Sequence, residues 1–259
     1  LCALDKKADD IEGEYAVKEI TEKFSCRDLK SFTLIFYLML FNCFFVYGGF
    51  FGFTDNVNDL MQKRFGFSQS SAGKYITIVY LIGGLLLPVF GHLVDNYGKR
   101  VTLMLISAVG FILTHLSIAF LDDRDPAAND PNYWMVLFLV TFGLSYCFYA
   151  SIFWPSIPLI VENKVQGSAF GLIFCLQSSM QAVIPKLTGK VHDLTEDYHS
   201  GYFWTQILLV GSVACGLAVT TTIYFVDKKT GRRLEGAKPE GGHYRNLIEE
   251  ENSALEKSR

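Results

Sequence analysis

The sequence predicts an all-α integral membrane protein built as a bundle of six helices. Two observations carry this prediction. Half of the 259 residues are hydrophobic, and the charged residues gather at both ends and in short clusters. Between the clusters lie six uncharged stretches, each long enough to cross ~30 Å of hydrocarbon as a helix. A spanning segment must satisfy its own backbone hydrogen bonds, so helices are expected. The competing interpretation, buried helices of a soluble core, would scatter charges along every element.

The six stretches without Asp, Glu, Lys or Arg are residues 31–54, 75–94, 101–121, 131–161, 165–185 and 201–226. The shortest has 20 residues (75–94) and the longest 31 (131–161), so each crosses once and none readily crosses twice. An even number of spans places both chain ends on one side. That side carries eleven Lys and Arg residues against six on the other. Because cytosolic loops carry the excess of these residues, both termini are expected in the cytosol.

The composition argues against several other classes of protein. A net charge of -3 is too small to indicate a nucleic-acid partner. The six cysteines show no metal-ligand spacing, so neither a metal nor another cofactor is expected. None of the five histidines stands in a paired motif with a carboxylate inside a span. This argues against a membrane enzyme, and no catalytic residue is proposed.

The loop between the second and third stretches carries a recognisable pattern, G-x-x-x-D-x-x-G-K-R, over residues 91–100. Gly91 is expected to let the end of one helix press closely against a neighbour. Asp95 is expected to neutralise the N-terminal end of an adjacent helix. Gly98 supplies the backbone freedom for a short turn, and Lys99 and Arg100 anchor the loop on the cytosolic side.

In this position between two spans, the loop resembles the signature of the major facilitator superfamily. Residues 64–68, 79–80, 88–91, 154–158 and 166–171 are similar to the C-terminal half of a family of lysosomal dipeptide transporters within it. The resemblance runs with gaps from residue 1 to residue 226. It implies twelve spans in two six-helix halves, of which this chain supplies the second. A missing N-terminal half, or a partner subunit, is expected to complete the protein.

This resemblance also sets the expected domain boundaries. Residues 1–30 are expected to be a cytosolic remnant of the central loop, and residues 31–226 the six-helix transmembrane bundle. Residues 227–259 are polar and rich in Gly and Glu, and we expect a largely disordered cytosolic tail. The chain opens without Met on a short apolar segment, so truncation at the N-terminus is expected. Tyr244 and Leu247 have the spacing of a lysosomal sorting signal, a short pattern that also arises by chance.

In such a fold the solute sits near mid-membrane, so polar and aromatic residues deep in the spans are candidate substrate-binding residues. In the first stretch we favour Tyr47 over Asn42, since it aligns with an aromatic position of the resembled family. Tyr80 is the candidate of the second stretch. Trp154, beside a proline kink, offers an indole that can stack and donate one hydrogen bond. A place in the interfacial aromatic belt is the alternative for Trp154.

The fifth stretch adds Gln177 and Gln181, one helical turn apart on one face. Their amides suit peptide carbonyls or termini, and hydrogen bonding between helices is the alternative. His115 is expected to be a structural, hydrogen-bonded histidine rather than a proton relay. No Asp or Glu lies within the six stretches. Transport without proton coupling is therefore expected, unless the coupling group lies in the missing half.

The resemblance implies a carrier that moves dipeptides or similar small organic solutes across a lysosomal membrane by alternating access. The substrate rests on analogy with the family rather than on the residues themselves. A non-transporting membrane scaffold or receptor of the same fold is the alternative, because such proteins share the loop signature. The expected partners are the lipid bilayer and a small solute, without nucleic acid.

Overall fold

The computed structural model describes residues 32–125, 130–198, 201–231, 234 and 235. The expected segment 1–30 and the tail from residue 236 lie outside them. Within these residues the six longest elements are helices long and apolar enough to cross a membrane, and no strand occurs. They are α2 (Leu34–Lys63), α3 (Gln69–Tyr97), α4 (Arg100–Ala119), α5 (Trp134–Ile160), α6 (Gln166–Leu194) and α7 (Tyr202–Lys229). The predicted six-helix fold is confirmed.

Several helices continue beyond the uncharged stretches that predict them. The 30 residues of α2 correspond to about 45 Å, which exceeds the ~30 Å of hydrocarbon. Its last turns carry Asp59 and Lys63, whose carboxylate and ammonium lie 2.9 Å apart. At the start of α3 the Ser68 hydroxyl accepts the Ser71 N–H at 3.3 Å, and this cap fixes where the helix begins. Charge patterning therefore locates the spans, while caps and turns set the helix ends.

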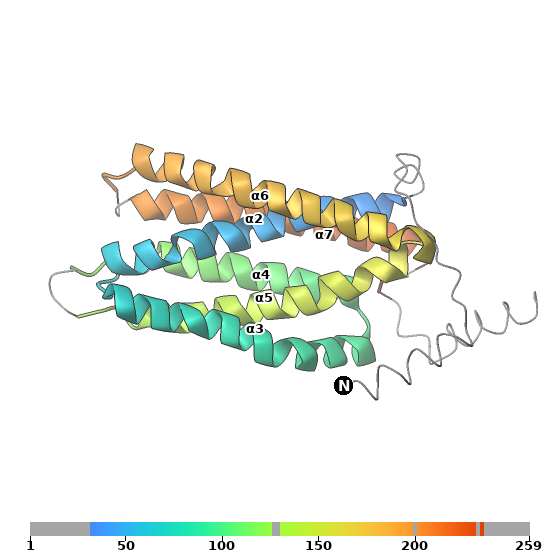
Figure 1. The fold of residues 1–259 in the computed structure, drawn as a ribbon, viewed down its shortest axis with the longest axis horizontal. Helices are drawn as coiled ribbons and strands as arrows, with labels where there is room; N and C mark the ends of the chain where they lie inside the picture. Colours follow the sequence, from blue (N-terminus) through green and yellow to red (C-terminus); the bar gives the residue numbers. More distant parts are fainter. Residues whose placement is uncertain (1–31, 126–129, 199–200, 232–233, 236–259) are drawn as a thin grey trace, which may run out of the picture. The chain divides into compact units, whose positions relative to one another are not determined.

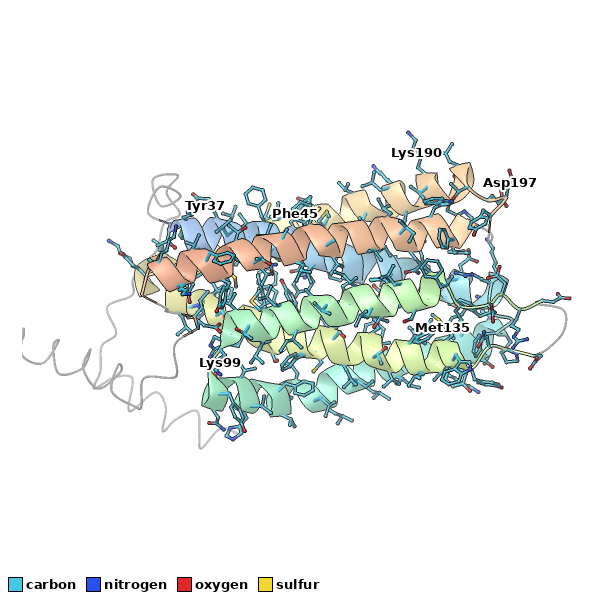
Figure 2. The ribbon with its side chains drawn as sticks, turned by 180° about the vertical axis from the view of Figure 1, so that it is seen from behind. Tyr37, Phe45, Lys99, Met135, Lys190 and Asp197 are labelled. Atoms are coloured by element: carbon cyan, nitrogen blue, oxygen red, sulfur yellow. The ribbon has the colours of Figure 1, made fainter. Side chains whose placement is uncertain are left out.

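The six helices run side by side (Figure 1). The start of α2, the α3–α4 turn and the end of α7 lie together at one end, here called the motif end. Figure 2 shows Lys99 at this end and Lys190 and Asp197 at the other. The main pairings are α3 with α5, α5 with α4, α4 with α7, α7 with α2 and α2 with α6. α3 and α6 are thus the two edge helices.

Burial separates the central helix from the edge helices. In its most apolar window, 61% of the residues of α2 are buried, against 6% for α3 and 22% for α6. α2 is the central helix of the bundle, and α5 also packs partly against it. The edge helices leave most of their surface uncovered within the described residues.

Glycines bring the central helices to close distance. A Cβ added at Gly49 of α2 would lie 2.4 Å from Cγ2 of Val213 on α7, and at Gly52 it would lie 2.5 Å from Cδ2 of Leu209. Only glycine fits such contacts. Small residues at helix interfaces are how membrane helices gain close van der Waals packing without a hydrophobic driving force between them.

A buried arginine holds the end opposite the motif end. Arg64 follows α2 and its side chain is 1% exposed. It donates to the carbonyls of Ile118 (3.1 Å), Ala119 (2.7 Å) and Leu121 (2.7 Å), and it pairs with the Asp123 carboxylate. The last carbonyls of a helix have no donor within that helix. Arg64 therefore caps the C-terminal end of α4 and ties it to α2.

A short C-terminal strap, residues 234 and 235, closes the motif end. Asp227, fully buried in the last turn of α7, accepts the backbone N–H groups of Leu234 (3.1 Å) and Glu235 (3.0 Å). The Leu234 carbonyl accepts the Arg100 N–H at 3.3 Å. The Glu235 carboxylate accepts the Thr102 N–H at 3.1 Å and also the Thr102 hydroxyl. The strap thus places a carboxylate on the N-terminal end of α4, where the helix dipole favours it.

Replacing Arg64 should cost far more stability than replacing its neighbour. Arg64→Met removes the donor of the Ala119 and Leu121 carbonyls at the end of α4, and we expect a loss of about 3 kcal/mol or more. Lys63→Met also removes one positive charge but only one exposed ion pair, so a loss within ~1 kcal/mol is expected. Unfolding of both variants in detergent micelles measures the difference, and equal losses would contradict the capping role of Arg64.

Removing one carboxylate oxygen should loosen the strap. In Asp227→Asn only one side-chain oxygen remains to accept the N–H groups of Leu234 and Glu235. We expect hydrogen exchange at these two amides to become ~10-fold faster, since about one hydrogen bond is lost. Peptide-resolved exchange measures this directly. The exposed Asp193→Asn is the charge-matched control and should leave the exchange of the strap unchanged.

Candidate functional site

Aromatic side chains from α2, α5 and α6 meet near the middle of the bundle. At their centre is Tyr47 of α2, whose side chain is almost fully buried. Its hydroxyl accepts the indole N–H of Trp154 from α5 at 2.7 Å. The Tyr146 and Phe153 rings of α5 lie 6.2 Å and 6.1 Å from the Tyr47 ring, in edge contacts. Two residues predicted from separate stretches, Tyr47 and Trp154, are therefore in direct contact.

Trp154 connects this centre to α6. Its ring stacks on Phe174 at 5.0 Å and lies nearly parallel to Phe170 at 6.3 Å between centroids. The indole N–H is directed at Tyr47 and not at a membrane surface. This position inside the bundle favours the site interpretation of Trp154 over the aromatic-belt alternative. Phe174 is about half exposed. The cluster therefore reaches the side of the bundle between the edge helices α3 and α6, here called the open side.

Gln177 and Gln181 continue the line of Phe170 and Phe174 along α6, because positions 170, 174, 177 and 181 share one helix face. Gln177 is half-buried and Gln181 is exposed. Among the described residues, neither amide has a hydrogen-bond partner. Both amides lie on the face of α6 that carries Phe170 and Phe174, the two rings beside Trp154.

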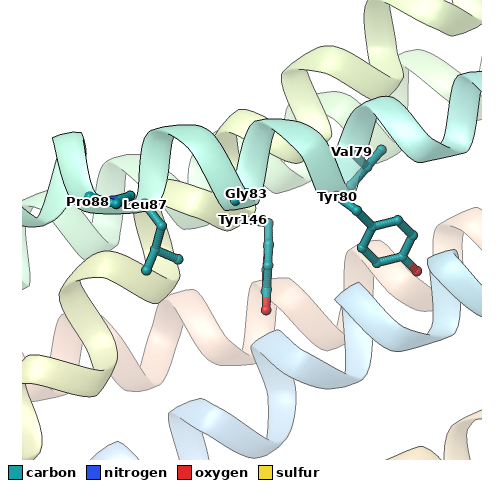
Figure 3. A pocket seen from close by; sticks show the side chains of 7 residues that line it. Val79, Tyr80, Gly83, Leu87, Pro88 and Tyr146 are labelled. Atoms are coloured by element: carbon teal, nitrogen blue, oxygen red, sulfur yellow. The ribbon is translucent and has the colours of Figure 1, made fainter. Parts of the chain in front are cut away.

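Tyr80 of α3 lies apart from the Tyr47–Trp154 contact and lines a pocket of about 330 Å³ between α3 and α5. Tyr146 forms another side of this pocket (Figure 3). The Tyr146 ring also stacks on Phe50 at 3.8 Å. Tyr146 therefore joins the pocket to the aromatic cluster. We call the whole set, Tyr47, Tyr80, Tyr146, Trp154, Phe174, Gln177 and Gln181, the aromatic site.

Sequence reasoning missed Tyr146. A usable signal was present: Tyr146, Tyr149 and Phe153 have the spacing i, i+3, i+7, which places them on one face of α5. The structure turns that face toward Tyr47. The signal was hidden in a stretch where aromatic residues are common and no charge marks one side.

Two other polar residues of the spans have structural partners. Asn42 accepts the Tyr149 hydroxyl at 2.6 Å and donates to the Gly216 carbonyl at 2.9 Å and to Thr220 Oγ1 at 2.6 Å. Its amide is fully buried and links α2, α5 and α7. His115 is likewise buried, with Nδ1 2.8 Å from Gln206 Oε1 of α7. Both side chains stabilise helix contacts and lie outside the aromatic site.

The signature loop forms a tight turn between α3 and α4. Gly98 has φ +64° and Lys99 φ +48°, so two successive residues take left-handed conformations. The Asp95 carboxylate accepts Arg100 Nη2 at 2.7 Å, and the strap occupies the N-terminal end of α4. A Cβ added at Gly91 would meet nothing within 4 Å. The close neighbour expected for Gly91 is not found among the described residues.

In the part of the chain that the structure describes, no three His, Cys, Asp or Glu side chains gather as a metal ion requires. The aromatic site has no formal charge, and what it offers is stacking surfaces, hydroxyl groups and amides. Six spanning helices with a signature loop at one end define the class: a multi-pass integral membrane protein.

The comparisons give the family. Residues 18–254 match the Major Facilitator Superfamily, and the chain belongs to this family. Similar proteins include the "Lysosomal dipeptide transporter MFSD1" of Bos taurus, at 28% identity over 234 residues, and that of Mus musculus, at 29%. The protein of that name from Homo sapiens is 27% identical. Each match covers 90% of this chain and 47% of the relative, so the chain spans about half the length of these relatives.

The predicted family resemblance is thereby confirmed, and the fold is that of one half of a major facilitator. The matched region includes the signature loop and all six described helices.

The contact between Tyr47 and Trp154 can be measured by a double-mutant cycle. Tyr47→Phe and Trp154→Phe each remove one partner of the buried hydrogen bond, and we expect each to cost ~1–2 kcal/mol. The double variant should cost less than the sum by about 1 kcal/mol, which is the coupling of the pair. Unfolding in detergent micelles measures all three. Tyr224→Phe on α7 is the control and should be nearly neutral, while additive losses in the cycle would contradict the contact.

Proposed function

We propose that this chain forms one half of a carrier that moves dipeptides, or similar small organic solutes, across a lysosomal membrane by alternating access and without proton coupling. The single observation that carries the proposal is the uncharged aromatic site, built around the Tyr47–Trp154 hydrogen bond. This site lies within spanning helices and reaches the open side between the edge helices α3 and α6.

The chemistry of the site suits a small peptide. Aromatic faces contact apolar side chains and Cα groups over a large area. The amides of Gln177 and Gln181 offer both donors and acceptors, which a peptide bond and its termini also require. The similar proteins named dipeptide transporters support the same class of solute.

A second six-helix half, or a partner subunit, completes the carrier in this proposal. Glycines of the edge helices support it. A Cβ added at Gly73 or Gly91 of α3, or at Gly171 or Gly189 of α6, would meet nothing within 4 Å among the described residues. Small residues on membrane helices usually serve close helix contact. The glycines of α2 make such contacts inside the bundle, and these four glycines are left for helices outside it.

The proposal of transport without proton coupling follows from where the carboxylates lie. Asp59 is at the end of α2, and Asp95 and Asp227 are at the motif end. Within the described residues, no carboxylate belongs to the aromatic site. A proton-coupled carrier usually needs an ionisable group embedded in the membrane.

The proposed orientation places the motif end, and with it both chain termini, in the cytosol. Lys99 and Lys164 lie in the connections at this end, Arg100 begins α4 there, and Lys228 and Lys229 end α7 there. At the opposite end, the buried Arg64 side chain donates to carbonyls at the end of α4 and adds little free positive charge to that surface. Arg100, which pairs with Asp95, is discounted equally at the motif end, so the excess of Lys and Arg at the motif end is kept.

Transport can be tested with the complete carrier, this chain with its second half, reconstituted in liposomes. We expect saturable exchange of a radiolabelled dipeptide that unlabelled dipeptide competes away. Collapse of the pH gradient with a protonophore should leave the rate unchanged. Trp154→Ala, which removes the indole between Tyr47 and Phe174, should lower uptake at least ~10-fold, since a stacking surface and a buried hydrogen bond are lost.

Trp204→Ala is the matched control, because Trp204 is half exposed near the start of α7 and outside the aromatic site. It should transport at close to the unsubstituted rate. Absence of saturable flux in a folded carrier would sink the transport proposal and favour a scaffold or receptor. Flux that vanishes with the pH gradient would overturn only the uncoupled mechanism.

A further inference from the structure

The pocket between α3 and α5 has an uncharged lining, part of which is exposed helix backbone. It is lined by Val79, Tyr80, Gly83, Gly84, Leu87, Pro88 and Tyr146 (Figure 3). A Cβ at Gly83 or Gly84 would meet open space, so no side chain of the described residues fills the position beside them. The helix backbone itself is therefore part of the pocket wall.

One backbone carbonyl in this wall lacks its usual donor. In an α-helix each carbonyl accepts the N–H of the residue four positions on. Pro88 lies inside α3 and has no N–H, so the carbonyl of Gly84 loses this bond. Among the described side chains, Cys147 approaches the neighbouring Gly83 carbonyl (Sγ–O 3.9 Å), and none donates to that of Gly84. Inside a membrane an acceptor without a donor is costly unless it lines a cavity and meets a ligand or water there.

Two tyrosines line the same pocket as Gly84. Tyr146 is fixed in place by stacking on Phe50 at 3.8 Å. Tyr80 is 58% exposed and extends from α3 (Figure 3). The faces of aromatic rings attract cations, and a tyrosine hydroxyl accepts hydrogen bonds as well. A wall that combines two tyrosines with a carbonyl lacking its helical donor is therefore suited to a positively charged group that donates hydrogen bonds.

We propose that this pocket binds the protonated amino group of the solute. The Gly84 carbonyl accepts one of its N–H groups, and the rings of Tyr146 and Tyr80 stabilise its charge. This inference rests on the proposed transport of dipeptides and narrows the solute to peptides with a free amino terminus. It also provides a way to hold a cation at a pocket where the described residues place no carboxylate.

The test restores the missing donor. Pro88→Ala supplies an N–H for the Gly84 carbonyl, so this carbonyl accepts a bond within the helix instead of one from the ligand. The substitution leaves the charges of the pocket unchanged. Competition binding to the complete carrier compares a dipeptide with its N-acetylated form, which has no ammonium group. We expect the unsubstituted carrier to prefer the free dipeptide at least ~10-fold, the size expected for a hydrogen bond to a charged group. In Pro88→Ala the affinity for the free dipeptide should fall to that of the acetylated form.

The ratio of the affinities for the free and the N-acetylated dipeptide separates the role of the Gly84 carbonyl from the role of a helix kink at Pro88. A kink alone would change both affinities in parallel. Val89→Ala, on the same turn but outside the pocket, is the control and should keep the preference. If Pro88→Ala fails to fold, Gly84→Val serves instead, since its side chain enters the open pocket and should remove the preference in the same way.

The outcomes are distinguishable. No preference in the unsubstituted carrier, or an unchanged preference in Pro88→Ala, overturns the ammonium pocket while the transport proposal stands. Absence of any dipeptide binding by the unsubstituted carrier overturns the proposed function itself, and the ammonium pocket with it.

Discussion

Backbone polar groups inside a membrane must find partners within the protein, and this constraint governs the structure. At the end opposite the motif end, the last carbonyls of α4 receive donors from Arg64. At the motif end, Asp227 and Glu235 receive backbone N–H groups from the strap and from α4. Arg64 and Asp227 are buried, and each of them satisfies two or more backbone groups at once. The same constraint makes Pro88 significant, since it removes the usual helical donor of the Gly84 carbonyl in the middle of a span.

The helices divide into two groups by what covers them. α2 is pressed against α7 through Gly49 and Gly52, and its polar Asn42 is fully hydrogen-bonded. Such contacts fix a rigid unit, since interiors packed this closely do not deform continuously. Among the described residues, the edge helices have glycines that face open space and side chains without hydrogen-bond partners, such as Gln177 and Gln181. A rigid centre and uncovered edges suit a body that moves as a unit against a second one, as alternating access requires.

The sequence was sufficient for the spans because hydrophobicity alone decides which segments enter lipid. It also singled out Tyr47 and Trp154, which the structure brings into contact, since a polar aromatic residue inside an uncharged run is conspicuous. It was insufficient for Glu235 and Tyr146. The partner of Glu235, Thr102, is 133 residues away, and no local sequence pattern predicts such a contact. Tyr146 became significant only when the pairing of α5 with α2 and α3 was known. Asp95 shows the same limit, because its partner Arg100 is evident only from side-chain geometry.

The lack of charge at the aromatic site also bears on how a solute leaves it. An embedded carboxylate would hold an ammonium group strongly, because Coulomb attraction rises as the dielectric falls. A carbonyl dipole and aromatic faces bind the same group more weakly. A carrier without an energy source gains nothing from tight binding, since its rate depends on release as much as on capture. Weak, uncharged recognition on the side of Tyr80 and Tyr146 therefore fits an uncoupled carrier better than a carboxylate would. Under the proposed function, selection between peptides then falls to the shape of the cluster around Trp154.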